Sequence, residues 1–189
     1  MNIDFYTSNE LREMGFGSVG ENVWVGKNCH IVNPENIHLS DDIKINPFCT
    51  LVAYKGSSIS IGKSVHIGGY SLLFALKPIF IGSFVSISSS VKIYTASDDF
   101  SGNSLLGFQI PDNLRDEKSK NIIVSNHCGI SSGSILLPGA YMPEGTVLGA
   151  NSLLKSIIEE TWIIVAGNPA KKISVRNKKP LLYVNSYPR

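Results

Sequence analysis

The side chains best suited to proton-transfer chemistry in this chain are its histidines and one pair of adjacent carboxylates. They are His30, His38, His66, His127, Asp98 and Asp99. Imidazole exchanges a proton near neutral pH, so a histidine can serve as a general base. Two adjacent carboxylates can orient such a base, bind hydroxyl groups, act as a base if burial raises a pKa, or only cap a turn. The elements that position these residues decide between the roles.

An aliphatic residue recurs at every sixth position over most of the chain, in blocks that begin at Val19. These residues are Val19, Val25, Ile31, Leu39, Ile45, Leu51, Ile61, Ile67, Leu73, Ile81, Ile87, Ile93, Val124, Ile130, Leu136, Met142, Leu148 and Leu154. A helix would repeat near 3.6 residues and a half-buried strand near two. A six-residue period instead predicts an all-β parallel β-helix, in which each aliphatic residue points inward and stacks on its equivalent one coil away.

Small or β-branched residues lie four positions after many of these aliphatic residues, where the chain must turn a corner. The cysteines Cys29, Cys49 and Cys128 all occupy such positions. We therefore interpret them as small buried side chains and not as a disulfide framework. Because the chain has no C-x-x-C pair, we expect no metal site built from cysteine.

The repeat predicts three regions: an N-terminal segment (1–16), the β-helix (17–170) and a basic C-terminal segment with a tail (171–189). A capping-type start and a glycine stop predict a short helix in Ser8–Gly15, and Lys171–Lys179 is a second candidate for a short helix. Residues 97–121 are polar and lack the six-residue phase, so we expect a long excursion loop. A long loop inside a regular solenoid favours a functional role.

The bulk composition is that of a soluble globular domain, with 189 residues, 43% hydrophobic and 17% charged. The formal net charge is only +2, so we expect no nucleic-acid partner. Neither a signal-peptide pattern nor an apolar run of membrane-spanning length is present, so we expect a cytoplasmic protein without membrane insertion.

Three segments late in the chain resemble the hexapeptide-repeat acyltransferases. They are Ile130–Gly139, Leu148–Lys155 and Ile164–Ala170. The likeness is greatest to the galactoside, maltose and xenobiotic O-acetyltransferase branch, and Ser97–Gly102 is similar to a version found in enzymes that decorate surface polysaccharides. The resemblance implies a left-handed β-helix, a homotrimer with active sites between adjacent subunits, and acetyl-CoA as the donor, with no metal.

Carried over by position, the resemblance also implies a set of CoA-binding residues. Ser131 and Ser132 would line the pantetheine arm, followed by Ala150 and Lys155, with Gly167 near the adenine. The cations Lys171, Lys172 and Arg176 could meet the phosphates, since phosphate favours Lys and Arg. An alternative for the small residues is corner packing alone.

The resemblance does not assign the catalytic base directly. In the galactoside and maltose enzymes a histidine begins the long loop, whereas here Asp98 stands in its place. His66 becomes the leading candidate because it projects outward just before the coil that bears the loop, with Asp98 or Asp99 orienting it or binding sugar hydroxyls. His127 is the next candidate, and His30 and His38 are expected to be structural or surface residues.

We therefore expect an acetyl-CoA-dependent O-acetyltransferase that acts on a sugar or a surface-polysaccharide precursor, which is free, nucleotide-linked or lipid-linked. One alternative is an N-acetyltransferase of a nucleotide-linked amino sugar, since an amine needs less help as a nucleophile. A non-catalytic β-helix scaffold is another alternative. A zinc-dependent lyase on the same fold would need three clustered histidines, which the spacing does not favour.

Overall fold

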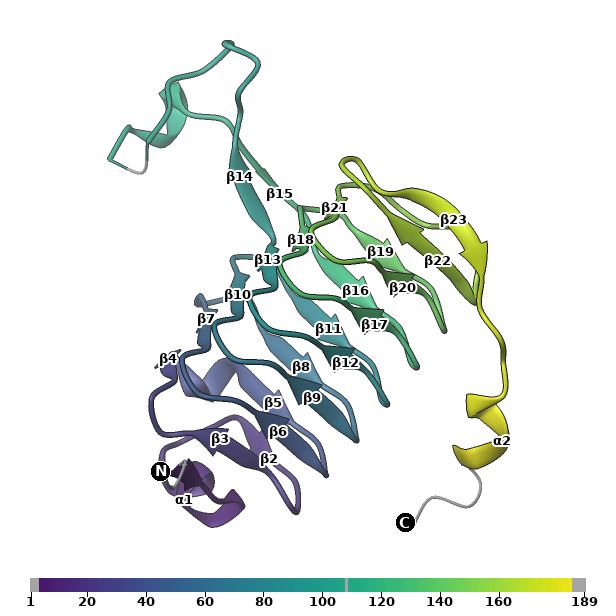
Figure 1. Cartoon of the computed structure of the whole chain (residues 1–189). Coiled ribbons are helices and arrows are strands. Elements are labelled where there is room, and N and C mark those ends of the chain that lie inside the picture. The colour runs from purple at the N-terminus through teal and green to yellow at the C-terminus, as the bar shows by residue number, and fades with distance from the viewer. Residues whose placement is uncertain (1–3, 108, 185–189) are drawn as a thin grey trace.

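The computed structural model describes residues 4–107 and 109–184 and forms a parallel β-helix (Figure 1). The predicted all-β class is confirmed. Three sheets form the walls of a prism, and we name them A, B and C. Sheet A contains β1 (Phe5–Tyr6), β3 (Trp24–Gly26), β6 (Ile43–Ile45), β9 (Val65–Ile67), β12 (Ser86–Ile87), β17 (Gly129–Ile130), β20 (Val147–Leu148), β22 (Ile163–Ala166) and β23 (Lys171–Val175).

The other two walls have similar short strands. Sheet B contains β2 (Ser18–Val19), β5 (Ile37–Leu39), β8 (Ile59–Ile61), β11 (Ile79–Ile81), β16 (Ile122–Val124) and β19 (Tyr141–Met142). Sheet C contains β4 (His30–Val32), β7 (Thr50–Ala53), β10 (Leu72–Ala75), β13 (Lys92–Tyr94), β18 (Ile135–Leu136) and β21 (Leu153–Leu154). Each coil runs from sheet B to A to C, so the prism has a B–A edge, an A–C edge and a C–B edge.

The six-residue repeat builds the core by stacking like on like. Ile45 pairs with Ile67, Ile67 with Ile87, and each of these side chains is fully buried. The small residues fill the corners, as Cys49 and Ser134 do with no exposed surface. Removing this apolar surface from water is the main force that stabilises the prism.

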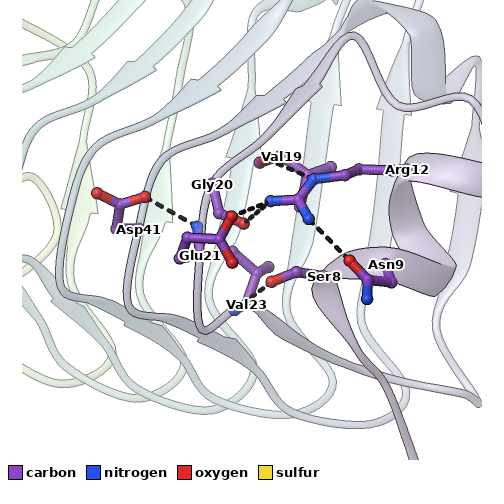
Figure 2. Close-up of polar contacts among 8 residues, drawn as sticks. All are labelled: Ser8, Asn9, Arg12, Val19, Gly20, Glu21, Val23 and Asp41. Carbon is purple, nitrogen blue, oxygen red and sulfur yellow. Dashed lines mark hydrogen bonds and ion pairs between the residues drawn. The ribbon is translucent and has the colours of Figure 1, made fainter.

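The first coil is covered by the N-terminal segment. Helix α1 (Ser8–Glu13), which the sequence predicts, has a capping box between Thr7 and Glu10. Its Arg12 guanidinium donates to the carbonyls of Val19 and Gly20, 3.1 and 3.0 Å away, and pairs with Glu21 (Figure 2). The helix thereby closes the open end of the solenoid, where unpaired strands would otherwise be exposed.

The excursion begins as an ordered arm, not as a structureless loop. Strand β14 (Ala96–Asp98) pairs antiparallel with β15 (Glu117–Ser119), and a 3-10 turn η2 (Asp112–Leu114) lies between them. The arm leaves the C–B edge after β13 and projects away from the prism (Figure 1). A shorter insertion at the same edge forms the 3-10 turn η1 (Pro34–Asn36).

At the root of the arm, the buried Thr95 hydroxyl accepts from the backbone N–H groups of Leu76 and Lys77 at 2.8 and 3.0 Å. It donates to the Phe74 carbonyl at 3.2 Å. Three hydrogen bonds therefore fix the point where the arm departs.

The expectation of a helix in Lys171–Lys179 is wrong. Lys171–Val175 forms strand β23, which folds back antiparallel on β22, and the short helix α2 covers Pro180–Val184 instead. The last coil leaves the edge of sheet A open, and the returning chain pairs its backbone groups there. The part of the predicted tail at 185–189 lies outside the described residues. In the described ranges, no helix has the length and hydropathy to cross a membrane.

Candidate active site

His66 lies on the outer face of sheet A, where strand β9 turns alternate side chains toward solvent. Its neighbours in register are Lys44 on one side and Ser86 on the other. Partial burial lowers the pKa of His66 from its ordinary value of 6.5, and the Lys44 charge lowers it further. Both effects favour the neutral imidazole, the form in which a base can accept a proton.

The two carboxylates of the arm have different surroundings. Asp98 ends strand β14 opposite Glu117, while the Asp99 side chain is buried in the turn that follows. The Asp99 carboxylate accepts from the Ser101 hydroxyl at 2.7 Å and from its backbone N–H at 3.2 Å. The Ser101 hydroxyl bond lowers the pKa of Asp99. Burial opposes this effect, but the net lowering favours the ionised carboxylate, which caps the turn through Ser101.

A single chain does not bring His66 and Asp98 together. His66 faces outward from sheet A, whereas the arm departs from the C–B edge, which is the edge that sheet A does not share. Figure 1 shows the arm on the side of the prism that carries β13 and β18. Any joint action of the two residues therefore requires two copies of the chain.

The predicted CoA residues divide between the edges of the prism. Ile130 pairs with Leu148, and Leu148 with Val165, so Ser132, Ala150 and Gly167 occupy equivalent places on successive coils at the A–C edge. All three are exposed, and Ser131 directly precedes Ser132 in the chain. Lys171 pairs with Ala166 and therefore starts β23 beside this row.

Lys155 lies elsewhere, at the C–B edge beneath the arm. It follows β21 and lines a hollow of about 630 Å³ together with Lys120, Tyr141 and Ile157. The family resemblance grouped Lys155 with Ser131, Ser132, Ala150 and Gly167 in one CoA channel, whereas in the single chain Lys155 lies on a different edge from these residues.

Two of the predicted phosphate ligands are already engaged at the B–A edge. Lys172 forms an ion pair with Glu160. Arg176 donates to the carbonyls of His127 and Gly145, and its guanidinium lies 5.3 Å from the centroid of the Trp162 ring. Both cations thus stabilise the last coil and its returning strand.

His127 is an edge residue in an aromatic column and not part of the outward row of His66. Its ring stacks on Phe84 at 5.1 Å and on Trp162 at 5.9 Å. Burial lowers its pKa. The sequence analysis missed this column, although a signal exists: the three aromatic residues directly precede the buried corner residues Val85, Cys128 and Ile163.

Comparison with known proteins connects these features to an activity. No family model matches the chain. The dTDP-4-amino-4,6-dideoxy-D-glucose acyltransferase of Escherichia coli is 35% identical over 172 residues, covering 91% of this chain and 88% of that protein. The putative lipopolysaccharide biosynthesis O-acetyl transferase WbbJ of E. coli K12 is 26% identical and covers 82% and 80% of the two chains.

Solved structures agree with the sequence relatives. A serine-to-alanine variant of AntD, an N-acyltransferase from Bacillus cereus, superposes with a TM-score of 0.92 at 35% identity over 99% of this chain and 98% of AntD. That structure contains dTDP-4-amino-4,6-dideoxyglucose and coenzyme A. A maltose O-acetyltransferase from Clostridium difficile shares the fold, at 22% identity and a TM-score of 0.57 over 90% and 74% of the two chains.

The expected enzyme class and the expected CoA-linked donor are thereby confirmed, and the scaffold alternative is wrong. The chain belongs to the hexapeptide-repeat sugar acyltransferases, which take their acyl group from CoA.

Proposed function

We propose that this protein is an N-acyltransferase that transfers an acyl group from CoA to the amine of a nucleotide-linked amino sugar. The observation that carries the proposal is the 35% identity, over nearly the whole chain, to two enzymes. The name of one specifies such an acceptor, and the other is an N-acyltransferase whose structure contains this nucleotide sugar. The replacement of the usual loop histidine by Asp98 agrees with an amine acceptor, since a neutral amine is a stronger nucleophile than a hydroxyl.

In the proposed reaction the amine nitrogen attacks the thioester carbon. A C–N bond forms, the C–S bond breaks, and CoA leaves as its thiol. The nitrogen must lose a proton, and we assign its removal to His66, whose neutral imidazole can accept it and pass it to the departing sulfur. Asp98 would hydrogen-bond the amine or the sugar hydroxyls, and Asp99 would hold the turn that positions Asp98.

The proposed assembly is a homotrimer with the three C sheets facing the axis. The outward face of sheet C carries an apolar group that is partly exposed in the single chain, beside His30, Thr50, Lys92 and Tyr94. The apolar residues are Val32, Val52, Leu72, Phe74, Ile135 and Leu153. The outward faces of sheets A and B carry polar residues such as Lys44, His66 and Ser60. A wall of this composition favours contact with a second apolar surface.

This arrangement brings the divided site residues together. With cyclic symmetry, the A–C edge of one copy meets the C–B edge of the next. The row of Ser131, Ser132, Ala150 and Gly167 would then face Lys155 and the arm of a neighbour, in a groove suited to an extended pantetheine chain. Asp98 of one copy would approach His66 of another. The free cysteines fit a reducing compartment, so we place the reaction in the cytoplasm.

The test of the reaction is an assay of the purified protein with acetyl-CoA and dTDP-4-amino-4,6-dideoxyglucose. We expect stoichiometric release of CoA thiol and an amide product identified by mass spectrometry. The matched control acceptor is the same nucleotide sugar with a hydroxyl in place of the amine. Acylation of the hydroxyl compound alone would make the enzyme an O-acyltransferase and reject the proposal. 3-Hydroxybutyryl-CoA as a second donor tests the acyl chain length.

The test of the base is His66→Gln. We expect turnover to fall by roughly a hundredfold or more with unchanged affinity for CoA. His38→Gln, on the outer face of sheet B, is the matched control and should retain full turnover. Wild-type turnover in the His66 variant would remove this residue from the mechanism.

The intersubunit site is tested by mixing two inactive variants, His66→Gln and Asp98→Asn, after unfolding and refolding them together. In random mixed trimers about a quarter of the interfaces carry both native residues, so about a quarter of the activity should return. No recovery would place both residues in one copy's site. Independently, Val52→Glu on sheet C should yield monomers by light scattering, whereas Ser60→Glu on sheet B should not.

A further inference from the structure

Two large aromatic rings stack on the outside of the prism at the A–C edge. The rings of Phe48 and Tyr70 have centroids 5.0 Å apart and planes 13° apart. Both side chains are largely exposed, at 51% and 65%. Ile45 pairs with Ile67, so the two aromatic residues hold the same place on successive coils. We call this pair the aromatic platform.

The fold itself does not call for aromatic residues at these places. Phe48 and Tyr70 adopt left-handed backbone conformations, with φ of 65° and 63°, which bulky residues rarely do. The equivalent places on later coils hold Ser90, Gly133 and Asn151, which are small or polar and also have positive φ. Phe84, His127 and Trp162 have similar φ values at the B–A edge, but their side chains are at least partly buried. Phe48 and Tyr70 carry largely exposed rings on a turn that small residues can make, which indicates a role for the ring faces.

Beyond Tyr70, the equivalent places along the edge hold smaller side chains. On the next two coils the equivalent residues, Ser90 and Gly133, have short side chains, so no aromatic ring covers Tyr70 from that side. Successive coils are about 4.8 Å apart, so the uncovered step can admit a planar group against the ring. Lys92, exposed at the start of β13, lies where sheet C meets the A–C edge and places a cation on the coil that follows Tyr70.

We propose that Phe48 and Tyr70 are the surface on which the base of the nucleotide-linked acceptor stacks, with Lys92 toward its phosphates. Aromatic side chains bind nucleobases by stacking on their π-faces, and Lys is suited to phosphate. This inference rests on the proposed function, because it locates the nucleotide of the same acceptor.

The position of the platform distinguishes it from the proposed donor site. Tyr70 lies on the coil before the one that bears the arm, whereas Ser132, Ala150 and Gly167 lie on the coils after it. The donor and the acceptor would thus approach the arm of the neighbouring copy from opposite ends of the A–C edge. The adenine of CoA is the other planar base in the reaction, and the experiment separates the two.

The experiment is calorimetric titration of wild type and Tyr70→Asn with dTDP and, separately, with CoA. Asparagine suits the left-handed turn, as Asn151 does at an equivalent place. We expect dTDP to bind roughly tenfold more weakly or worse, since a lost stack has about that effect, and CoA to bind unchanged. Tyr70→Phe should retain wild-type affinity. Phe80→Ser, which removes an exposed ring from sheet B, should leave both affinities unchanged.

Each other outcome has a defined meaning. If wild type binds dTDP and Tyr70→Asn binds it equally well, the platform is rejected while the proposed function stands. If only the affinity for CoA falls, the rings bind the adenine of the donor and the assignment to the acceptor is rejected. If wild type binds no dTDP, the nucleotide-linked acceptor itself is rejected. Light scattering of Tyr70→Asn and of Phe48→Asn checks assembly, and weaker binding that merely follows dissociation of the assembly overturns the proposal.

Discussion

Gly145→Ala tests whether the aromatic column at the B–A edge stabilises the last coils. Gly145 sits between the coils of His127 and Trp162, and its missing side chain lets the Trp162 ring reach across to His127. A Cβ built at Gly145 would lie 2.3 Å from Cδ2 of Trp162, and the backbone there has a φ of +71°. Alanine therefore forces the indole out of its place.

The size of the effect follows from the contacts that are lost. A left-handed alanine costs about 1 kcal/mol or somewhat more. Displacing the Trp162 ring removes a stack worth about 0.5–1.5 kcal/mol and a contact with Arg176 worth about 0.5–1 kcal/mol. The indole is only 2% exposed, so any water it meets adds to the loss. We expect a total of about 2–4 kcal/mol, or a fall in Tm of roughly 5–12 °C for a chain of this size.

Gly56→Ala is the matched control. Gly56 also has a left-handed φ, of +82°, but a Cβ there would meet nothing within 4 Å. It should lose only the backbone contribution, about 1 kcal/mol. The assay is urea unfolding at one fixed protein concentration, since assembly would couple to stability, with tryptophan fluorescence as the probe. Equal losses in the two alanine variants would refute the role assigned to the column.

Three further predictions concern other groups. Because the pKa of His127 is lowered from 6.5, the folded protein binds fewer protons than the unfolded protein, so its stability should fall as pH drops below about 6.5. His127→Phe keeps a stacking ring and should flatten this pH dependence. An equally steep profile in the variant would contradict His127 as the cause. Cys29 is partly exposed and its interaction with Cys49 lowers the pKa of its thiol, whereas Cys49 is buried and its pKa is raised. Peptide mapping after brief iodoacetamide treatment at pH 7.5 should therefore find Cys29 alkylated first, and preferential labelling of Cys49 would argue against this pairing. Thr95→Val should cost about 1–3 kcal/mol by leaving two partly buried N–H groups unpaired, and Thr95→Ser should not, as measured by urea unfolding. Equal stabilities of the two variants would show that the hydroxyl does not hold the root of the arm.

The sequence alone determined the prism, because a solenoid's core is a local, repeating arrangement. Ile45, Ile67 and Ile87 stack since each lies one coil from the next, and the six-residue period records that spacing directly. The helix at Ser8 and the departure of the chain after Tyr94 were also visible, as a capping pattern and a break in phase.

The tertiary structure decided what no period records: which edge of the prism each corner occupies and what reaches it from afar. Lys155 and Ala150 are close in sequence yet lie on different edges, and Arg176 reaches the carbonyl of His127 across 49 residues. The sequence does not distinguish Asp99 from Asp98, but in the structure the Asp99 carboxylate caps the turn by accepting a hydrogen bond from Ser101. Such outcomes depend on packing in three dimensions. The reach of each side chain and the return of the last strand determine which residues are in contact, and spacing along the chain does not.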